Sequence, residues 1–379
     1  FRRTEIAMSC CKSERKAKDT VDDENVHKMV QDYYGKQLQS SKDLKTNACT
    51  SSGRPHDIIL NALKEVPQPI KDRYYGCGSP LPFGIDGLHV LDLGSGSGRD
   101  CYVASKLVGE DGFVTGIDMT DEQLDLANSH IEEYTKTLGY EKPNIKFVKG
   151  YIEFLDKAGI ESNSQDLVIS NCVINLSPAK TRVVQEVYRV LKEGGEFYFS
   201  DVYCDRRIPS ELRSHEILYG ECLSGALYVE DFKRICHKAG FADPRIVSRS
   251  PIDVNDPELK ELLGNCQFFS ITFRLFKLPS LETVCEDYGQ FAMYRGEISG
   301  HTHNYPLDDH HLFITNKPML VCGNTAAMLS ETWLAKNFHV DGFRDVHYGP
   351  FDCGGNSVEG PNTGKVVTAT SSGGTSSCC

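Results

Sequence analysis

Short runs of apolar residues alternate with longer amphipathic stretches between residues 89 and 200. The apolar runs predict five β-strands, at residues 89–93, 113–118, 145–149, 166–170 and 196–200. The stretches between them predict helices, and those at 122–136 and 179–192 repeat apolar residues near a period of 3.6. Strands that alternate with helices form a mostly parallel sheet covered on both faces. The predicted fold class is therefore α/β, with a doubly wound, Rossmann-like sheet.

The same pattern continues beyond the fifth strand. A helix is expected at 229–239, where Gly240 ends it, and two more strands at 245–248 and 268–278 complete the sheet. The segment 201–227 is extra material between the fifth strand and this helix.

A smaller α+β region is expected after about residue 280. Strands at 290–294, 312–315 and 319–321 precede a helix at 325–337, with Asn324 or Thr325 as its N-cap and Trp333 packing on its apolar face. Four parts follow from these patterns: a charged extension (1–48), the α/β domain (49–250), a C-terminal α+β region (251–352) and a flexible tail rich in Gly, Ser, Thr and Cys (353–379).

Composition narrows the classes of protein. The chain has 41 Lys and Arg against 53 Asp and Glu, a net charge of −12, which argues against nucleic-acid or membrane-surface partners. No apolar run is long enough for a membrane span or a secretory signal, so we expect a cytoplasmic protein with reduced thiols. Fifteen cysteines are too few for a disulfide scaffold, which needs roughly 8–10% Cys. Their number is also odd, so they cannot all pair with one another.

A glycine-rich loop follows the first predicted strand. The sequence LDLGSGSGRD places Gly94, Gly96 and Gly98 where backbone can approach a ligand, and Asp118 ends the next strand. Ser95 and Ser97 supply hydroxyl groups. Binders of NAD, FAD and nucleoside sulfonium compounds all use such loops, and a plain βα turn with a solvated Asp118 is the alternative. The spacing departs from the dinucleotide pattern because the third glycine is displaced.

Three segments resemble class I S-adenosylmethionine-dependent methyltransferases: LDLGSGSG, GID and EVYRVLKEGGEFYFSD. The resemblance covers roughly residues 75–250. It implies a seven-stranded sheet, with S-adenosylmethionine bound at the carboxyl ends of the first four strands.

Four cysteines stand in loop-like sequence. Cys172 follows the fourth strand, Cys222 lies in the extra segment, Cys77 is flanked by glycines, and Cys49 lies in a polar loop. Because neighbouring strands end at one edge of the sheet, we expect Cys172 and Cys222 to converge there. Small apolar core roles are expected for five others, in periodic or apolar settings: Cys101, Cys236, Cys266, Cys285 and Cys322. Cys204 stays unassigned.

Four motifs together resemble the arsenite methyltransferases: SNCVINL, YYGCG, GECLSGALY and TNAC. The resemblance extends through FRLFK at 273–277, and the residues after 285 depart from the family pattern. It implies four arsenic-relevant cysteines, Cys49, Cys77, Cys172 and Cys222, with Cys77, Cys172 and Cys222 holding arsenic(III). It further implies that 251–352 completes the arsenic site. The implied cofactor contacts are Tyr75, Gly94, Ser95, Gly96, Asp118, Met119, Ile152 and Glu153.

The implied chemistry suits these residue types. Trivalent arsenic is thiophilic, and soft thiolates select soft centres. Its lone pair can attack the sulfonium methyl group, so neither a general base nor a metal cofactor is expected. Mono- and dimethylated products follow, and Cys77 and Cys49 serve as disulfide-forming electron donors, which thioredoxin or glutathione resets. Two alternatives are a methyltransferase for another small acceptor and a thiol-rich protein that only sequesters metalloids.

The histidines of the C-terminal region invite a metal hypothesis. His301, His303, His310 and His311 lie within eleven residues, but no cysteine or acidic ligand has convincing zinc spacing. We expect them to be solvated loop residues instead.

Overall fold

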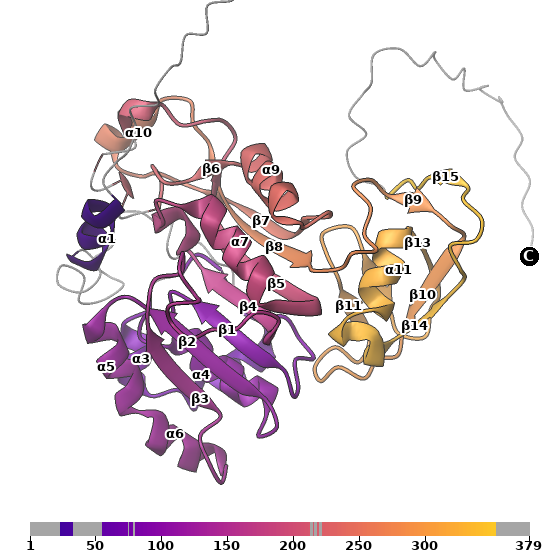
Figure 1. Ribbon diagram of the computed structural model, residues 1–379, viewed down its shortest axis with the longest axis horizontal. Coiled ribbons are helices and arrows are strands. Elements are labelled where there is room, and N and C mark those ends of the chain that lie inside the picture. The colour runs from indigo at the N-terminus through magenta and orange to yellow at the C-terminus, as the bar shows by residue number, and fades with distance from the viewer. Residues whose placement is uncertain are drawn as a thin grey trace, which may run out of the picture.

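The structure is a computed structural model (Figure 1). It describes residues 23–32 and 55–353, except residues 75, 79, 213, 214, 216, 217, 220 and 221. A large α/β body carries a smaller C-terminal α+β region at one side (Figure 1). Within the described residues, no helix combines the length and apolarity needed to cross a membrane.

The large body is built on one mixed sheet in the order β3-β2-β1-β4-β5-β8-β7. The strands are β1 (His89–Leu93), β2 (Phe113–Asp118), β3 (Ile145–Lys149), β4 (Gln165–Asn171), β5 (Leu191–Cys204), β7 (Arg245–Ile252) and β8 (Phe268–Phe276). The first five run parallel and β8 runs antiparallel, while the short β6 (Leu227–Tyr228) adds to the end of β5. The predicted doubly wound α/β sheet is confirmed, with this short eighth strand in addition.

Helices cover both faces of this sheet. They are α2 (Asp57–Leu63), α3 (Gln68–Asp72), α4 (Arg99–Val108), α5 (Asp121–Ser129), α6 (Ile131–Leu138), α7 (Lys180–Val190), α9 (Val229–Ala239) and α10 (Pro257–Leu263), with α1 (Asp23–Asp32) preceding them. One apolar core lies between the sheet and α7 and α9, and another between the sheet and α2 and α4. The helix predicted at 229–239 ends at Gly240, whose φ of 115° suits glycine.

One predicted helix is wrong in its extent. The stretch 122–136 is split into α5 and α6 at His130, where φ is −109° and ψ is 0°. The side chains of Asn128 and Ser129 donate to carbonyls of their own helix, Leu124 O at 2.8 Å and Leu126 O at 2.7 Å. Such local bonds compete with regular helix continuation.

The domain boundary predicted at residue 250 is also wrong, because it falls inside β7. β8 lies between β5 and β7, so the sheet needs the chain as far as Phe276. The large body therefore ends near residue 278.

The C-terminal region is α+β, as predicted. A three-stranded antiparallel sheet is formed by β13 (Met319–Val321), β10 (Gln290–Tyr294) and β14 (Phe338–Asp341). Two smaller pairs join β11 (Asn304–Pro306) to β12 (Leu312–Ile314) and β9 (Glu286–Asp287) to β15 (Gly349–Pro350). The helix predicted at 325–337 is instead α11 (Gly323–Ser330) followed by a 3₁₀ turn (Trp333–Asn337). Its N-cap is Cys322, whose Sγ accepts from Thr325 N, and not Asn324 or Thr325.

A buried ion pair joins the sheet to the C-terminal region. Arg274 Nε on β8 donates to Glu196 Oε1 on β5 at 2.8 Å, and both side chains are almost fully buried. Trp333 Nε1 donates to the second carboxylate oxygen of Glu196 at 3.1 Å, and the Arg274 guanidinium also donates to Leu307 O. Trp333 therefore packs as predicted and also ties the two parts of the molecule together.

Candidate active site

A cavity lies at the carboxyl ends of the central strands. It encloses about 980 Å³ of free space, part of which opens to solvent. Its wall comes from the loop after β1, the ends of β2 and β4, the turn after β3, and one face of α1. Seven of the eight predicted cofactor contacts line it: Gly94, Ser95, Gly96, Asp118, Met119, Ile152 and Glu153. The eighth, Tyr75, lies outside the described residues.

The glycine loop and Asp118 hold each other in place. Gly96 N donates to Asp118 Oδ2 at 2.9 Å, and Thr120 N donates to Oδ1 at 2.8 Å. Gly94 and Gly96 have φ of 65° and 52°, values that glycine adopts without cost. A Cβ on Gly94 would lie 2.4 Å from Val173 Cγ1, so the loop can approach β4 only with glycine there. Burial raises the pKa of Asp118, against the lowering effect of these backbone hydrogen bonds.

The two serines of the loop have different roles. Ser97 Oγ donates to Ile70 O and Arg73 O, so it binds the loop to α3 and is not free for a ligand. Ser95 Oγ is buried without a hydrogen-bond partner among the described residues. An orphaned hydroxyl beside a carboxylate fits a ligand rich in hydroxyl and amine groups, such as the adenosine part of S-adenosylmethionine.

Helix α1, although distant in sequence from the strands of the cavity, forms part of the cavity wall. His27 Nε2 lies 3.2 Å from Glu153 Oε1, and the His27 ring contacts the Tyr151 ring at a centroid distance of 4.7 Å. Gln31 Nε2 donates to Met119 O at 3.0 Å. Burial alone would raise the pKa of Glu153, but hydrogen bonds from His27 and from the Ser177 hydroxyl bring it below its ordinary value.

Three of the four predicted arsenic-relevant cysteines meet at the inner wall of the cavity. Cys77 and Cys172 form a disulfide with a Cα–Cα distance of 5.9 Å, and Cys222 Sγ donates to Cys172 O at 3.3 Å. Only Cys172 lines the cavity, with the other two behind it. The expected convergence is observed, but the expectation of reduced thiols is wrong for Cys77 and Cys172. Cys49 lies outside the described residues.

Close backbone approach brings Cys77 onto the end of β4. A Cβ on Gly78 would lie 2.1 Å from Ser200 Oγ, and one on Gly76 would lie 2.3 Å from Tyr74 Oη. Each flanking glycine therefore removes a clash that any other residue would create. Ser270 Oγ donates to Cys77 O at 2.6 Å and fixes the loop from β8.

Asn171 clamps this loop, a role that sequence reasoning missed. Its Nδ2 donates to Tyr74 Oη at 2.7 Å and to Asp100 Oδ2 at 2.9 Å, while its Oδ1 accepts from Gly78 N at 3.2 Å. The Arg99 guanidinium lies 3.6 Å from the centre of the Tyr74 ring. The only available signal was the position of Asn171 at a strand end, beside a cysteine.

Two of the three cysteines adopt an unusual backbone conformation. Cys172 has a φ of 57° and Cys222 a φ of 62°, the left-handed region that non-glycine residues rarely enter. Such strain costs of order 1–3 kcal/mol and persists where the surroundings fix it, typically at functional sites.

Apolar side chains surround the three cysteines. Leu176, Val202, Leu218 and Leu223 belong to the same buried cluster. The chain after residue 250 contributes Leu259 and Leu263 from α10 and Phe268 from β8. No described residue after 177 lines the cavity. The completion of an arsenic site by 251–352 stays a prediction.

The predicted core cysteines divide into two groups. Cys101 and Cys236 are buried, and Cys101 Sγ donates to Asp92 Oδ2 at 3.1 Å. Cys266 packs against the cluster around Cys222, and Cys204, left unassigned, is buried in it. Cys285 and Cys322 depart from the expectation, because with Cys353 they form a group of three thiols.

The histidine stretch is only partly solvated. His303 and His310 are exposed, but His301 is buried against Phe83 with a centroid distance of 4.4 Å. His311 is buried beside Asp308, with Nδ1 2.7 Å from Oδ1. The prediction of solvated loop residues is thus wrong for His301 and His311, because both pack against the body of the protein.

The sheet order and the cavity define a class I methyltransferase fold. A family model described as a methyltransferase domain matches residues 85–240. Similar curated proteins are the arsenite methyltransferase of Aquipseudomonas alcaligenes, 48% identical over 93% of this chain and 100% of that protein, and that of Mus musculus, 48% identical over 84% of each. The chain belongs to the arsenite methyltransferase family.

A solved structure agrees with this assignment. An arsenic(III) S-adenosylmethionine methyltransferase from Chlamydomonas reinhardtii is 57% identical and superimposes with a TM-score of 0.77, over 79% of this chain and 100% of that one. The Aquipseudomonas match covers 354 residues and must include most of the chain after residue 285. The expected departure from the family after residue 285 is therefore wrong.

Proposed function

We propose that this protein transfers methyl groups from S-adenosylmethionine to thiol-bound trivalent arsenic. The observation that carries the proposal is that Cys77 and Cys222 both contact Cys172, which lines a nucleoside-type cavity. The family relationship supports arsenite as the substrate.

Residues of the cavity position the cofactor. S-adenosylmethionine, when bound, supplies an electrophilic methyl group on a sulfonium. Asp118 would accept hydrogen bonds from the nucleoside part of the cofactor, and the Ser95 hydroxyl would donate one to it. Glu153 would bind a polar group of the cofactor on the side of the cavity formed by α1. Cys172 is the thiol on the cavity wall, so it would bring arsenic to the cofactor.

The thiols must be reduced before they bind arsenic. Two electrons and two protons from a dithiol reductant, of the thioredoxin or glutathione type, open the Cys77–Cys172 disulfide. Three thiols then displace three hydroxyl groups of arsenous acid, forming three As–S bonds and releasing three waters. The left-handed conformations of Cys172 and Cys222 would direct both thiols to one point.

Methyl transfer then needs little more than positioning. The bound cofactor would supply its methyl group to the arsenic lone pair and leave as S-adenosylhomocysteine, and arsenic would pass from the trivalent to the pentavalent state. Two protein thiolates would return two electrons to arsenic by forming a disulfide. The external dithiol would then reduce this disulfide, and repetition would yield the dimethylated product. Cys49 is proposed to join this exchange. No resident metal is required, because the lone pair itself is the nucleophile, and positioning alone supplies effective molarities of about 10⁵ M or more.

The proposal describes a cytosolic enzyme with small-molecule partners. The reducing cytosol supplies the required dithiols. The net charge of −12 gives no support for nucleic-acid or membrane partners.

Turnover of arsenite with S-adenosylmethionine and a dithiol is the direct test. Cys172→Ser and Cys222→Ser should each lower methylated arsenic by roughly 100-fold or more, because the acceptor loses its position. Cys266→Ser is the matched control, since this thiol packs near the same cluster but lies off the cavity. Normal arsenite methylation by both variants would overturn the proposal.

A further inference from the structure

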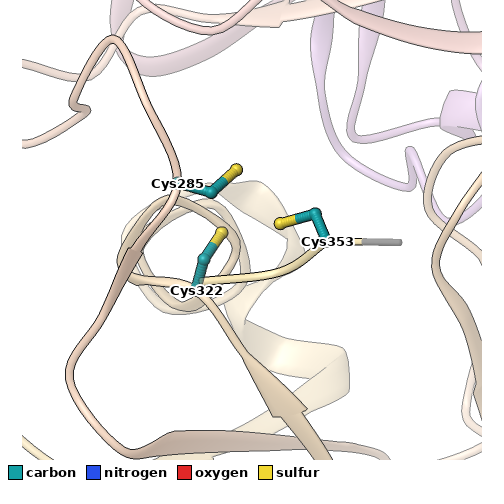
Figure 2. Close-up of side chains that lie close together, drawn as sticks. All are labelled: Cys285, Cys322 and Cys353. Atoms are coloured by element: carbon teal, nitrogen blue, oxygen red, sulfur yellow. The ribbon is translucent and has the colours of Figure 1, made fainter. Parts of the chain in front are cut away.

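Three cysteines from separate segments meet in the C-terminal region. Cys285 precedes β9, Cys322 follows β13, and Cys353 follows β15. Their Sγ atoms all lie within 4.8 Å of one another. Figure 2 shows the three side chains lying close together.

Backbone pairing places these thiols, independently of any bond between them. Pro350 pairs with Glu286 across β15 and β9, and Phe351 N donates to Cys285 O at 2.9 Å. This short ladder carries Cys353 next to Cys285. Cys322 is set by its place as N-cap of α11, where its Sγ accepts from Thr325 N at 3.4 Å.

A cation of the large body lies beside the group. The Arg245 guanidinium, at the start of β7, lies 3.7 Å from Cys322 Sγ. Arg245 is itself held by Asp243 and Asp308, at 2.9 Å each. The group therefore sits where the C-terminal region meets the sheet.

The number and type of ligands select the ion. Three thiolates suit a soft ion, and structural zinc sites take four protein ligands. Among the described residues, no fourth Cys, His, Asp or Glu joins this group. Trivalent arsenic completes its coordination with three sulfurs and keeps its lone pair free.

We propose that Cys285, Cys322 and Cys353 form a second arsenic(III) site, separate from the cavity. Arsenous acid exchanges its three hydroxyl groups for the three sulfurs, and each thiol proton leaves with one hydroxyl group as water, so three waters are released with no change in oxidation state. None of the three thiols lines the cavity, so arsenic held here is bound and not methylated. The site goes beyond the proposed function and does not depend on methyl transfer.

Arsenic binding by the full chain tests the site. The background is a variant with Cys77→Ser, Cys172→Ser and Cys222→Ser, reduced and then freed of reductant. Arsenite is added, and bound arsenic per chain is measured together with its X-ray absorption spectrum. The remaining cysteines are present in every variant, so their contribution cancels in comparisons.

Adding Cys322→Ser to this background should remove about one arsenic per chain and the three-sulfur spectrum. Serine can still accept the hydrogen bond from Thr325 N, so α11 keeps its cap. Cys285→Ser, at a half-buried position, should give the same loss, whereas Cys266→Ser should retain the arsenic. Unchanged binding in both cluster variants would overturn the proposal, as would a tightly held zinc ion that arsenite does not displace.

The two proposals fail separately. With the cavity cysteines intact, Cys322→Ser should still methylate arsenite. Loss of the C-terminal arsenic together with retained methylation supports the second site without bearing on the first. A chain that binds arsenic at Cys322 but never methylates it would overturn only the proposed function.

Discussion

At the scale of single residues, the site depends on side chains that hold cysteines rather than on the cysteines alone. Asn171 fixes the Cys77 loop by hydrogen bonds to Tyr74, Gly78 and Asp100. The amide is the group that both donates and accepts in this arrangement.

Asn171→Ala should destabilise the protein by about 2–3 kcal/mol, because buried partners lose hydrogen bonds. It should also slow closure of the Cys77–Cys172 disulfide. Urea unfolding and timed thiol counting measure the two effects. Asn128→Ala, which removes a bond within one helix, is the control and should leave disulfide closure unchanged. Normal closure in Asn171→Ala would contradict the clamp.

The lowered pKa of Glu153 makes the stability of the protein depend on pH, and it determines the sign of that dependence. A carboxyl with a lower pKa when folded stabilises the protein above its unfolded pKa of about 4.3, and this contribution is lost as pH falls through the folded pKa. Glu153→Gln should therefore show a smaller loss of stability than wild type between neutral pH and the acid range. Urea unfolding across pH measures it, with exposed Glu132→Gln as the control. Parallel pH curves for wild type and Glu153→Gln would contradict the prediction.

At the scale of elements, α1 is the part of the cavity that lies farthest away in sequence. It precedes β1 by more than fifty residues and still contributes His27 and Val30 to the wall. Its described contacts are polar through His27 and Gln31, and apolar through Val26 and Val30, which pack in the cluster around Cys222.

His27→Ala should weaken S-adenosylmethionine binding roughly five- to tenfold, because α1 loses its contacts with Glu153 and Tyr151. Calorimetric titration measures the affinity. Lys28→Ala changes an exposed neighbour on the same helix and should bind normally. Equal affinities in the two variants would mean that α1 does not support the cofactor site.

The periodicity of apolar residues was sufficient to predict the strands, but not to predict several helix and domain boundaries. The runs at 89–93, 113–118 and 145–149 match β1, β2 and β3 because buried parallel strands are nearly continuous apolar stretches. The split at His130 depends on side chains that donate hydrogen bonds to carbonyls of their own helix. The spacing of apolar residues does not reveal such bonds. The three-thiol group depends on the pairing of β9 with β15, a tertiary contact between residues more than sixty positions apart.

The cofactor wall was predictable because strand ends share one edge of the sheet. The hydrogen bonds of Ser97 could not be predicted, because its partners, Ile70 O and Arg73 O, are backbone groups in a preceding segment. Asn171 was missed for the same reason, since its role depends on hydrogen-bond partners that are distant in the sequence.

At the scale of the whole molecule, two buried ion pairs lie at the junction between the sheet and the C-terminal region, Arg245 with Asp308 and Arg274 with Glu196. Arg274 and Glu196 are buried together, and Trp333 and Leu307 complete their hydrogen bonds.

Arg274→Met should cost about 3–5 kcal/mol of unfolding free energy, because it leaves the Glu196 carboxylate buried and unpaired. The double variant Arg274→Met/Glu196→Gln should recover much of this loss. Arg207→Ala removes an exposed ion pair and should change stability little. Urea unfolding of the three variants decides the matter, and equal stability of Arg274→Met and wild type would contradict the prediction.

The Cys77–Cys172 disulfide also acts on the unfolded chain. Its partners are 95 residues apart, and the closed loop contains β1 to β4 with the helices between them. Closing a loop of that size removes unfolded-state entropy worth about 4–5 kcal/mol in the chain-entropy model. Each catalytic cycle would then change the conformational entropy that the unfolded chain has across about half of the α/β body. The oxidised protein should therefore stay folded at temperatures that unfold its reduced form.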